Sequence, residues 1–277
     1  MFSFPLTCTV RRCGLTLARR DRVLVCPAGH SYDVARSGYV NLLQPQDRRS
    51  RAAGDAKSVV EARARLFAAG TGRAVLDALA SRAATLTLDA HAGVADLGSG
   101  SGDLLGTLSA RLPIAGVGVD LSQAAAEHAA RRYPALTWVV ANADRRLPFP
   151  DRSAKLVLSL HGRRNPSECA RVLAPGGFLL MAVPAPDDLV ELRALVGGQP
   201  LARERSHRLV DDHTGHFMLV EQITVRERQH LDRGMLLDLL RITYRGERRS
   251  AAPRVDALTS LEVTMASEVF LLAPVQT

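Results

Sequence analysis

The chain has 277 residues, a net charge of +8 and an isoelectric point near 10. Its 47% hydrophobic and 23% charged residues are typical of a globular protein, and no run of 18 apolar residues predicts a membrane span. We therefore expect a cytoplasmic protein with no membrane partner, whose four cysteines are thiols or metal ligands rather than disulfides. The positive charge suits a polyanion such as nucleic acid, or is a solvated basic surface.

Residues 1–45 predict a small zinc-finger-like domain. Cys8, Cys13, Cys26 and His30 follow the spacing C-x4-C-x12-C-x3-H. Three thiolates and one imidazole suit a tetrahedral structural Zn²⁺, which supplies folding energy that so short a segment cannot obtain by burial. The alternative is a metal-free segment with buried thiols.

Residues 46–85 predict a basic linker followed by helices. The polar stretch from Gln44 to Lys57 carries Arg48, Arg49 and Arg51, which suit phosphate contacts or are solvated. From Val59 to Ala84, apolar side chains recur every three or four residues, which is the period of a helix.

Residues 86–277 predict an α/β fold, a Rossmann-like parallel sheet covered by helices. Expected strands are 94–97, 117–120, 138–140, 156–160 and 178–183, with helices after the first glycine turn to 112, at 124–132 and at 166–173. Cys169 on the last of these helices is expected to be a buried core thiol. In the tail, helices at 188–196 and 233–240 accompany strands at 217–226, 261–264 and 269–272, which can close the sheet with an antiparallel pair.

A glycine loop follows the first expected strand of this sheet. Asp96 ends the strand, and Gly98, Ser99, Gly100 and Gly102 follow it. Glycines let the backbone approach a ligand closely and adopt positive φ, and the next helix adds free N–H groups. Alone, the loop also fits a nicotinamide-dependent dehydrogenase.

Further residues favour a methyl donor as the cofactor. Asp120 closes the second strand, where its carboxylate can bind both ribose hydroxyls or instead cap the next helix. Asn142, Ala143 and Asp144 follow the third strand, where an acidic side chain can accept from an adenine amino group or simply form a turn. With the turn Pro175-Gly176-Gly177, this ordered set resembles the class I methyltransferases. The resemblance implies S-adenosylmethionine as cofactor, with Leu121 and Leu160 among its contacts.

The N-terminal residues carry a more specific resemblance. The run from Cys26 to Leu43, CPAGHSYDVARSGYVNLL, resembles the zinc-finger signature of the bacterial 23S rRNA guanine-N1 methyltransferases, which include housekeeping and macrolide-resistance enzymes. The likeness continues through Gly54-Asp55, Glu61-Ala62-Arg63, the glycine loop and the tail at 261–264. It implies methyl transfer to N1 of a guanine in a 23S rRNA hairpin, with the finger helping to recognise the RNA.

The chain departs from this family at several points. The first ligand pair is C-x4-C rather than C-x2-C, Thr71-Gly72 replaces a common His-Tyr, and the loop 160–166 after the fourth strand is altered. Two alternatives therefore stay open: a small-molecule N- or C-methyltransferase, and a non-catalytic RNA-binding protein. Within the altered loop, His161 is a candidate general base or an exposed loop histidine.

The front of the chain also suggests where RNA would bind. Residues 1–55 contain nine arginines and four aspartates, a net charge of +5. Arg36, Tyr39, Arg48, Arg49 and Arg51 are candidate substrate contacts by phosphate pairing or base stacking. Tyr39 and Tyr32 can equally pack the core of the small domain. A homodimer is a further expectation.

Overall fold

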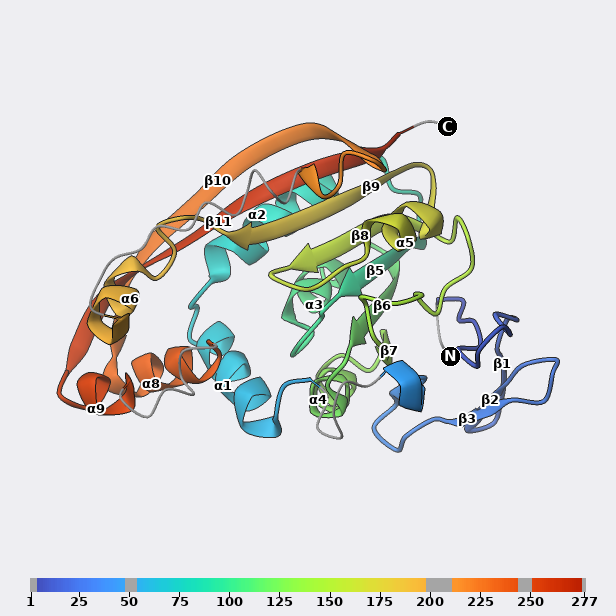
Figure 1. Cartoon of the computed structure of the whole chain (residues 1–277), viewed down its shortest axis with the longest axis horizontal. Helices are drawn as coiled ribbons and strands as arrows, with labels where there is room; N and C mark the ends of the chain where they lie inside the picture. Colours follow the sequence, from blue (N-terminus) through green and yellow to red (C-terminus); the bar gives the residue numbers. More distant parts are fainter. Residues whose placement is uncertain (1–3, 48–53, 198–210, 244–250, 276–277) are drawn as a thin grey trace.

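The chain forms a small three-stranded ribbon followed by a larger mixed sheet with helices on its faces (Figure 1). The computed structural model describes residues 4–47, 54–197, 211–243 and 251–275. The ribbon strands are β1 (Ala18–Arg20), β2 (Val23–Val25) and β3 (Ser31–Asp33). The larger sheet contains β4 (Val40–Asn41), β5 (Ala92–Leu97), β6 (Ile114–Asp120), β7 (Thr137–Val140), β8 (Ala154–Leu160), β9 (Leu173–Pro184), β10 (Phe217–Asp232) and β11 (Ser260–Pro274).

The larger sheet has the strand order β10-β11-β9-β8-β5-β6-β7-β4. The strands from β9 to β4 in this order pair in parallel, whereas β11 is antiparallel to both β9 and β10. The order reverses between β5 and β8, where the parallel strands leave a crevice at their carboxyl ends. This topology confirms the predicted Rossmann-like α/β fold and its antiparallel closing pair.

The helices connect these strands largely as the hydrophobic periodicity predicts, and the last one, α9, is a helix that was not expected. They are α1 (Lys57–Ala68), α2 (Arg73–Ala84), α3 (Asp103–Ser109), α4 (Gln123–Arg132), α5 (Pro166–Val172), α6 (Val190–Gly197), α8 (Arg233–Arg241) and α9 (Ala251–Asp256), with a 3-10 turn η1 at Pro45–Asp47. In the described parts of the chain, no helix combines the length and the apolar character that a membrane span requires.

Several element boundaries differ from the prediction, and three of these differences have a clear local reason. The helical stretch expected at 59–84 is divided into α1 and α2, because Gly70 and Gly72 have φ of 89° and 77°, in the left-handed region that interrupts a helix. The tail segments 261–264 and 269–272 form one strand, β11, since β10 pairs with it along its length. β9 already begins at Leu173, so the Pro-Gly-Gly turn lies inside this strand.

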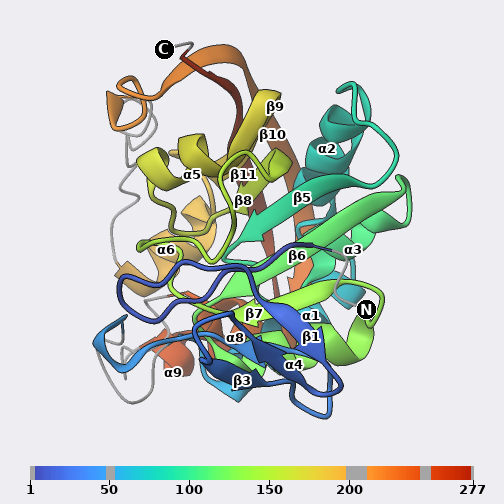
Figure 2. The same cartoon turned by 90° about the vertical axis from the view of Figure 1, so that its right-hand side faces the viewer.

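The two faces of the larger sheet are covered differently. Side chains of α2, α3 and α4 pack on one face. On the other face, the N-terminal segment and ribbon share a hydrophobic core with the sheet and α5, to which Cys169 contributes a fully buried thiol. Figure 2 shows this N-terminal segment running across the sheet. The ribbon therefore takes the place of a covering layer.

A cap of helices lies at one end of the sheet. Helices α1, α6, α8 and α9 gather there with the far ends of β10 and β11 (Figure 1). Their apolar side chains form a separate cluster that includes Leu66, Leu192, Leu231, Leu236 and Val263. This cap faces the carboxyl ends of the parallel strands, and it is therefore in position to roof a ligand site.

Candidate cofactor cavity and metal site

A cavity of about 1150 Å³ opens between the carboxyl ends of β5–β9 and the cap. Most of the residues predicted to bind the cofactor line it: Asp96, Gly98, Ser99, Gly100, Asp120, Leu121, Asn142, Ala143, Asp144 and Leu160, together with His161. The topology thus collects side chains from four strand ends that lie far apart in the sequence.

The loop after β5 presents bare backbone to this cavity. Gly98 and Gly100 have φ of 75° and 53°, and a Cβ on Gly98 would lie 3.0 Å from the Cα of Gly162. Gly102, by contrast, is not among the lining residues, and a Cβ there would lie 2.6 Å from the Trp138 ring. Gly102 therefore has a packing role, because the glycine lets α3 approach the sheet closely, and cofactor contact at this position stays a prediction.

Asp96 is a buried carboxylate with unsatisfied oxygens. Its side chain is 1% exposed, and neither oxygen has a hydrogen-bond partner among the described residues. Burial, reinforced by the charge of Asp120, raises the pKa of Asp96 to about 7. An ionised carboxylate in this position is unfavourable unless a cationic group pairs with it. S-adenosylmethionine carries an ammonium and a sulfonium charge, so this carboxylate and the glycine loop fit that cofactor.

Asp120 lies at the end of β6 and accepts two backbone hydrogen bonds. Its Oδ2 accepts from the Gly100 N–H and its Oδ1 from the Ser122 N–H, both at 2.8 Å. The N-cap residue of α4 is Ser122, whose Oγ accepts a hydrogen bond from the Ala125 N–H at 3.1 Å. The helix-cap alternative for Asp120 is thus wrong. Burial raises the pKa of Asp120, while the two N–H groups act to lower it.

Among the cavity residues that were not singled out from the sequence as cofactor contacts, Gly54, Asp55 and Arg63 lie next to the glycine loop. Arg63 Nη2 lies 2.8 Å from Asp55 Oδ2, and its Nη1 would lie 3.2 Å from a Cβ on Gly100. A Cβ on Gly54, whose φ is 82°, would lie 2.4 Å from the Ser122 backbone nitrogen. The segment before α1 therefore closes directly over the glycine loop. The available signal was the family resemblance, which includes these positions.

The loop after β7 carries the predicted adenine contacts. Asn142 Oδ1 accepts from the Asp144 N–H at 3.0 Å, and Asp144 Oδ2 accepts from Arg163 Nη1 at 3.1 Å. Asp144 therefore lies in a side-chain-stabilised turn, as the simpler sequence interpretation proposed, and also at the cavity wall.

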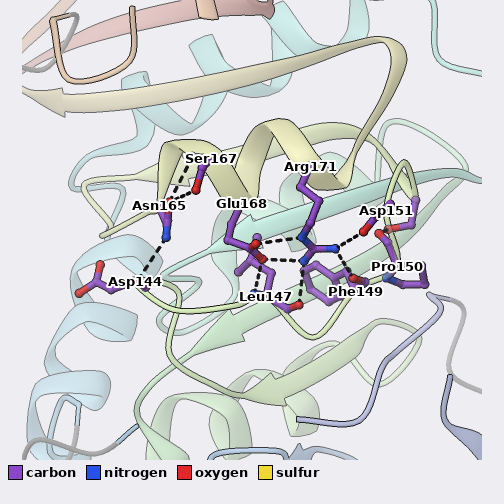
Figure 3. Close-up of polar contacts among 10 residues, drawn as sticks. Asp144, Leu147, Phe149, Pro150, Asp151, Asn165, Ser167, Glu168 and Arg171 are labelled. Atoms are coloured by element: carbon purple, nitrogen blue, oxygen red, sulfur yellow. Dashed lines mark hydrogen bonds and ion pairs between the residues drawn. The ribbon is translucent and has the colours of Figure 1, made fainter. Parts of the chain in front are cut away.

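Helix α5 holds this loop in place (Figure 3). Arg171 donates to the carbonyl oxygens of Phe149 at 2.9 Å and Leu147 at 3.1 Å. Glu168 Oε2 accepts from the Leu147 N–H at 2.8 Å and pairs with Arg171 Nη2 at 2.6 Å. These contacts satisfy the polar backbone of the loop and fix the chain that leads from Asp144 back to β8.

His161 stands where β8 ends, at the cavity, with a φ of 54°. Its Nε2 lies 3.0 Å from Ser267 Oγ on β11. The surrounding protein, together with the positive charge of Arg63, lowers the pKa of His161 to about 4. Because the ring surface is also open to the cavity, solvent works against this shift. Whether the pKa of His161 is about 4 or is held closer to its ordinary value of 6.5 by solvent, most of the imidazole is neutral at pH 7.

The four predicted metal ligands converge. The ligand atoms of Cys8, Cys13, Cys26 and His30 all lie within 4.8 Å of one another. Cys13 Sγ is 3.8 Å from Cys26 Sγ, and tetrahedral zinc with Zn–S bonds of about 2.3 Å separates its sulfurs by about 3.8 Å. His30 presents Nδ1, which is 3.4 Å from Cys26 Sγ. The looser C-x4-C spacing is therefore compatible with a zinc site.

The predicted substrate contacts have different surroundings. Arg36 is exposed on the ribbon side, whereas Tyr39 is buried in the core cluster that includes α4. The Tyr32 hydroxyl lies 3.1 Å from Cys8 Sγ, inside the ribbon. The packing interpretation thus describes both tyrosines. Arg48, Arg49 and Arg51 lie outside the described residues.

Comparisons with known proteins identify the family. Residues 94–177 match the family described as Methyltransferase domain, and residues 7–51 match the zinc-ribbon family described as RlmA, N-terminal. A 23S rRNA (guanine(748)-N(1))-methyltransferase of Streptomyces fradiae is 37% identical over 232 residues, which cover 81% of this chain and 80% of the relative. The chain belongs to the 23S rRNA (guanine-N1) methyltransferase family.

A second family member has a similar likeness. A Micromonospora griseorubida protein, provisionally named a 23S rRNA (guanine-N1) methyltransferase, is 35% identical over 85% of this chain and 84% of its own. A solved structure from Bacillus halodurans C-125, provisionally named a methyltransferase, has a TM-score of 0.51 at 16% identity. It covers 70% of this chain and 97% of that one, and it shows the fold alone.

Membership in the 23S rRNA (guanine-N1) methyltransferase family identifies the cofactor and the metal that this protein uses. The chain is an S-adenosylmethionine-dependent methyltransferase, and its Cys₃His cluster is a structural zinc site of the ribbon. The dehydrogenase and metal-free alternatives are therefore excluded.

Proposed function

We propose that this protein transfers a methyl group from S-adenosylmethionine to N1 of a guanine in a 23S rRNA hairpin. Family membership over four fifths of the chain carries the proposal. The cavity supports it, because its apolar walls from the cap continue beyond the residues suited to the cofactor and leave room for an extruded base.

We assign each residue that is expected to contact the cofactor to one part of that molecule, according to its chemistry. We assign the ribose hydroxyls to Asp120, the adenine to Asn142, Ala143 and Asp144, and the methionine part to Asp96 and the glycine loop. Leu121 and Leu160 complete the apolar contacts. When bound, S-adenosylmethionine supplies an electrophilic methyl group. The protein's task is to hold a nucleophile in line with that group and to exclude water.

His161 is proposed to face the N1 position of the acceptor. If Nε2 donates to Ser267 Oγ, then Nδ1 is the acceptor, and a neutral imidazole can take the N1 proton. His161→Ala should then lower the turnover number about 100-fold with both substrates saturating. An unchanged turnover number would remove His161 from the mechanism.

The ribbon is the part of the protein that we propose binds the RNA. Arg11, Arg12, Arg20, Arg22 and Arg36 are exposed there, and guanidinium groups pair well with phosphates. We propose that the ribbon binds the RNA backbone, with Arg48, Arg49 and Arg51 in the adjoining linker as further contacts. RNA affinity should consequently fall steeply as salt is raised.

The deciding experiment is methyl transfer from labelled S-adenosylmethionine to unmodified 23S rRNA hairpin transcripts, followed by mass-spectrometric mapping of the product. Methyl on a guanine N1 supports the proposal. Cofactor binding without transfer to any hairpin or intact subunit would favour a small-molecule acceptor. The expected cytoplasmic location and homodimer remain predictions, which cell fractionation and sedimentation of the full chain would test.

A further inference from the structure

Asp188 lies on the side of the cavity where we expect the methyl acceptor, and one of its carboxylate oxygens has no hydrogen-bond partner among the described residues. Six aspartates line the cavity: Asp55, Asp96, Asp103, Asp120, Asp144 and Asp188. The first five lie at the segment before α1, the glycine loop, or the ends of β6 and β7, where the cofactor residues gather. Asp188 alone of these follows β9, on the other side of β8.

The Asp188 side chain is fixed at one end. Its Oδ1 accepts from the Ala266 N–H of β11 at 2.9 Å, while Oδ2 has no hydrogen-bond partner among the described residues. Burial raises the pKa of Asp188 to about 6, although the Ala266 N–H and the positive charge of Arg193 act to lower it, and the group is mostly ionised at neutral pH. A carboxylate oxygen that lies at a cavity wall without a hydrogen-bond partner among the described residues favours a ligand that donates a hydrogen bond.

Asp188 and His161 are anchored to consecutive residues of one strand. His161 Nε2 lies 3.0 Å from Ser267 Oγ, and Asp188 binds the backbone of Ala266. The two side chains come from the ends of β8 and β9, which are neighbours in the sheet. This wall of the cavity therefore offers two hydrogen-bond acceptors held by a common support.

A guanine offers a matching pair of donors, N1–H and the exocyclic N2 amino group, side by side on its Watson–Crick edge. We propose that Asp188 Oδ2 accepts a hydrogen bond from the N2 amino group of the target guanine, while His161 faces N1. This inference rests on the proposed function and adds the residue that selects guanine. During transfer the N1 electron pair forms the bond to the methyl carbon, sulfur keeps the pair of the broken bond, and the N1 proton leaves to His161.

The test compares two hairpins that differ only at the target base, one with guanine and one with inosine, which keeps N1–H but lacks the N2 amino group. Wild-type enzyme should prefer guanine by about 10- to 100-fold in kcat/KM, the range for a charged hydrogen bond. Asp188→Asn, whose amide oxygen can still accept from Ala266, should lose this preference through a slower guanine reaction. Its inosine reaction should change less than about threefold.

Glu191→Gln is the matched control. Glu191 accepts from the Thr264 N–H at 2.8 Å and so supports β11 as Asp188 does, but it does not line the cavity. Its guanine preference should equal that of wild type. Equal losses on both hairpins in Asp188→Asn, or no preference in wild type, would overturn the inference. Failure of wild type to methylate guanine N1 would instead overturn the proposed function.

Discussion

Arg65 and Asp238 form a two-pronged ion pair between α1 and α8, with Nε–Oδ2 and Nη2–Oδ1 distances both at 2.7 Å. Asp238 is largely buried, and Arg241 also reaches its Oδ1 at 2.9 Å. This pair joins the helix that closes over the glycine loop to the helix that roofs the rest of the cavity. The two sides of the cavity roof are therefore mechanically connected.

Arg65→Ala should lower the free energy of unfolding only modestly, because the arginine is half-exposed and its ion pair is screened by solvent. The hydrogen bond from Arg65 lowers the pKa of Asp238 below 3.8. The pair's contribution is thus complete above pH 4 and is lost as pH falls through the lowered pKa. Urea unfolding at pH 7 and pH 3 should show a smaller difference between variant and wild type at pH 3. Arg73→Ala, which breaks an exposed pair with Asp77, should have little effect at either pH.

Asp96→Asn should stabilise the ligand-free protein and weaken cofactor binding. Burial raises the pKa of Asp96 from 3.8 to about 7, so the wild type loses stability as pH rises from about 4, where the unfolded chain ionises, to about 7. The variant avoids that loss, so its stability advantage over wild type should be larger at pH 8 than at pH 5, by roughly 2–3 kcal/mol. Thermal unfolding at both values tests the first effect, and calorimetric titration with S-adenosylhomocysteine tests the second. Equal stability of the two proteins at pH 8 would contradict the argument.

Asp120→Ala should weaken S-adenosylhomocysteine binding by tenfold or more. The change removes the proposed ribose contact and also leaves the Gly100 and Ser122 N–H groups without their acceptor. Asp187→Ala is a suitable control, because Asp187 pairs with Arg226 outside the cavity. The affinity of the Asp187→Ala variant for S-adenosylhomocysteine should match that of wild type.

Gly54→Ala should also reduce cofactor affinity, although no ligand contact is assigned to this residue. A methyl group there meets the Ser122 backbone at 2.4 Å, and the φ of 82° is strained for alanine. The segment must then move away from Asp120. Gly38→Ala tests for a general effect of strain, since Gly38 has a φ of 103° but open space around its Cβ position. Its cofactor affinity should stay near that of wild type.

Zinc removal should destabilise the whole protein rather than the ribbon alone. Cys8 and Cys26 belong to the same buried cluster as Ala95 and Val117 of the central sheet. Chelation, or Cys13→Ala with zinc content measured by atomic spectrometry, should lower the melting temperature of the single main transition and weaken S-adenosylhomocysteine binding. A zinc-free protein with unchanged melting and affinity would show that the ribbon is energetically independent.

The α/β fold could be predicted from the sequence, as could the residues that come together at the cavity from the glycine loop and the strand ends, because both follow from local rules. A buried strand that ends in Asp96 and leads into glycines has few structural alternatives, and the ligand spacing from Cys8 to His30 is short enough to interpret directly. The packing role of Gly102 could not be predicted, because a glycine needed for close helix packing and one needed for ligand approach look alike in sequence.

The remaining site residues could not be read from local patterns. Arg63 reaches the glycine loop, Asp188 reaches the cavity and Ser267 reaches His161 only through the long-range order of the strands. Nothing in the sequence around Asp188 distinguishes it from Asp187 next to it. One faces the cavity and the other pairs with Arg226, a difference set by the pairing of the chain after β9 with β11.

The pairing of β4 with β7 limits how this protein can be re-engineered. Val40 and Asn41 lie in register with Val139 and Val140, immediately before the adenine-side loop. A chimera that took residues 4–47 from a relative would have to match this strand edge as well as the apolar face beneath the ribbon. A version that lacked those residues would expose an unpaired strand, a site for self-association. Target selectivity is therefore best transferred with the ribbon, β7 and its loop as one block.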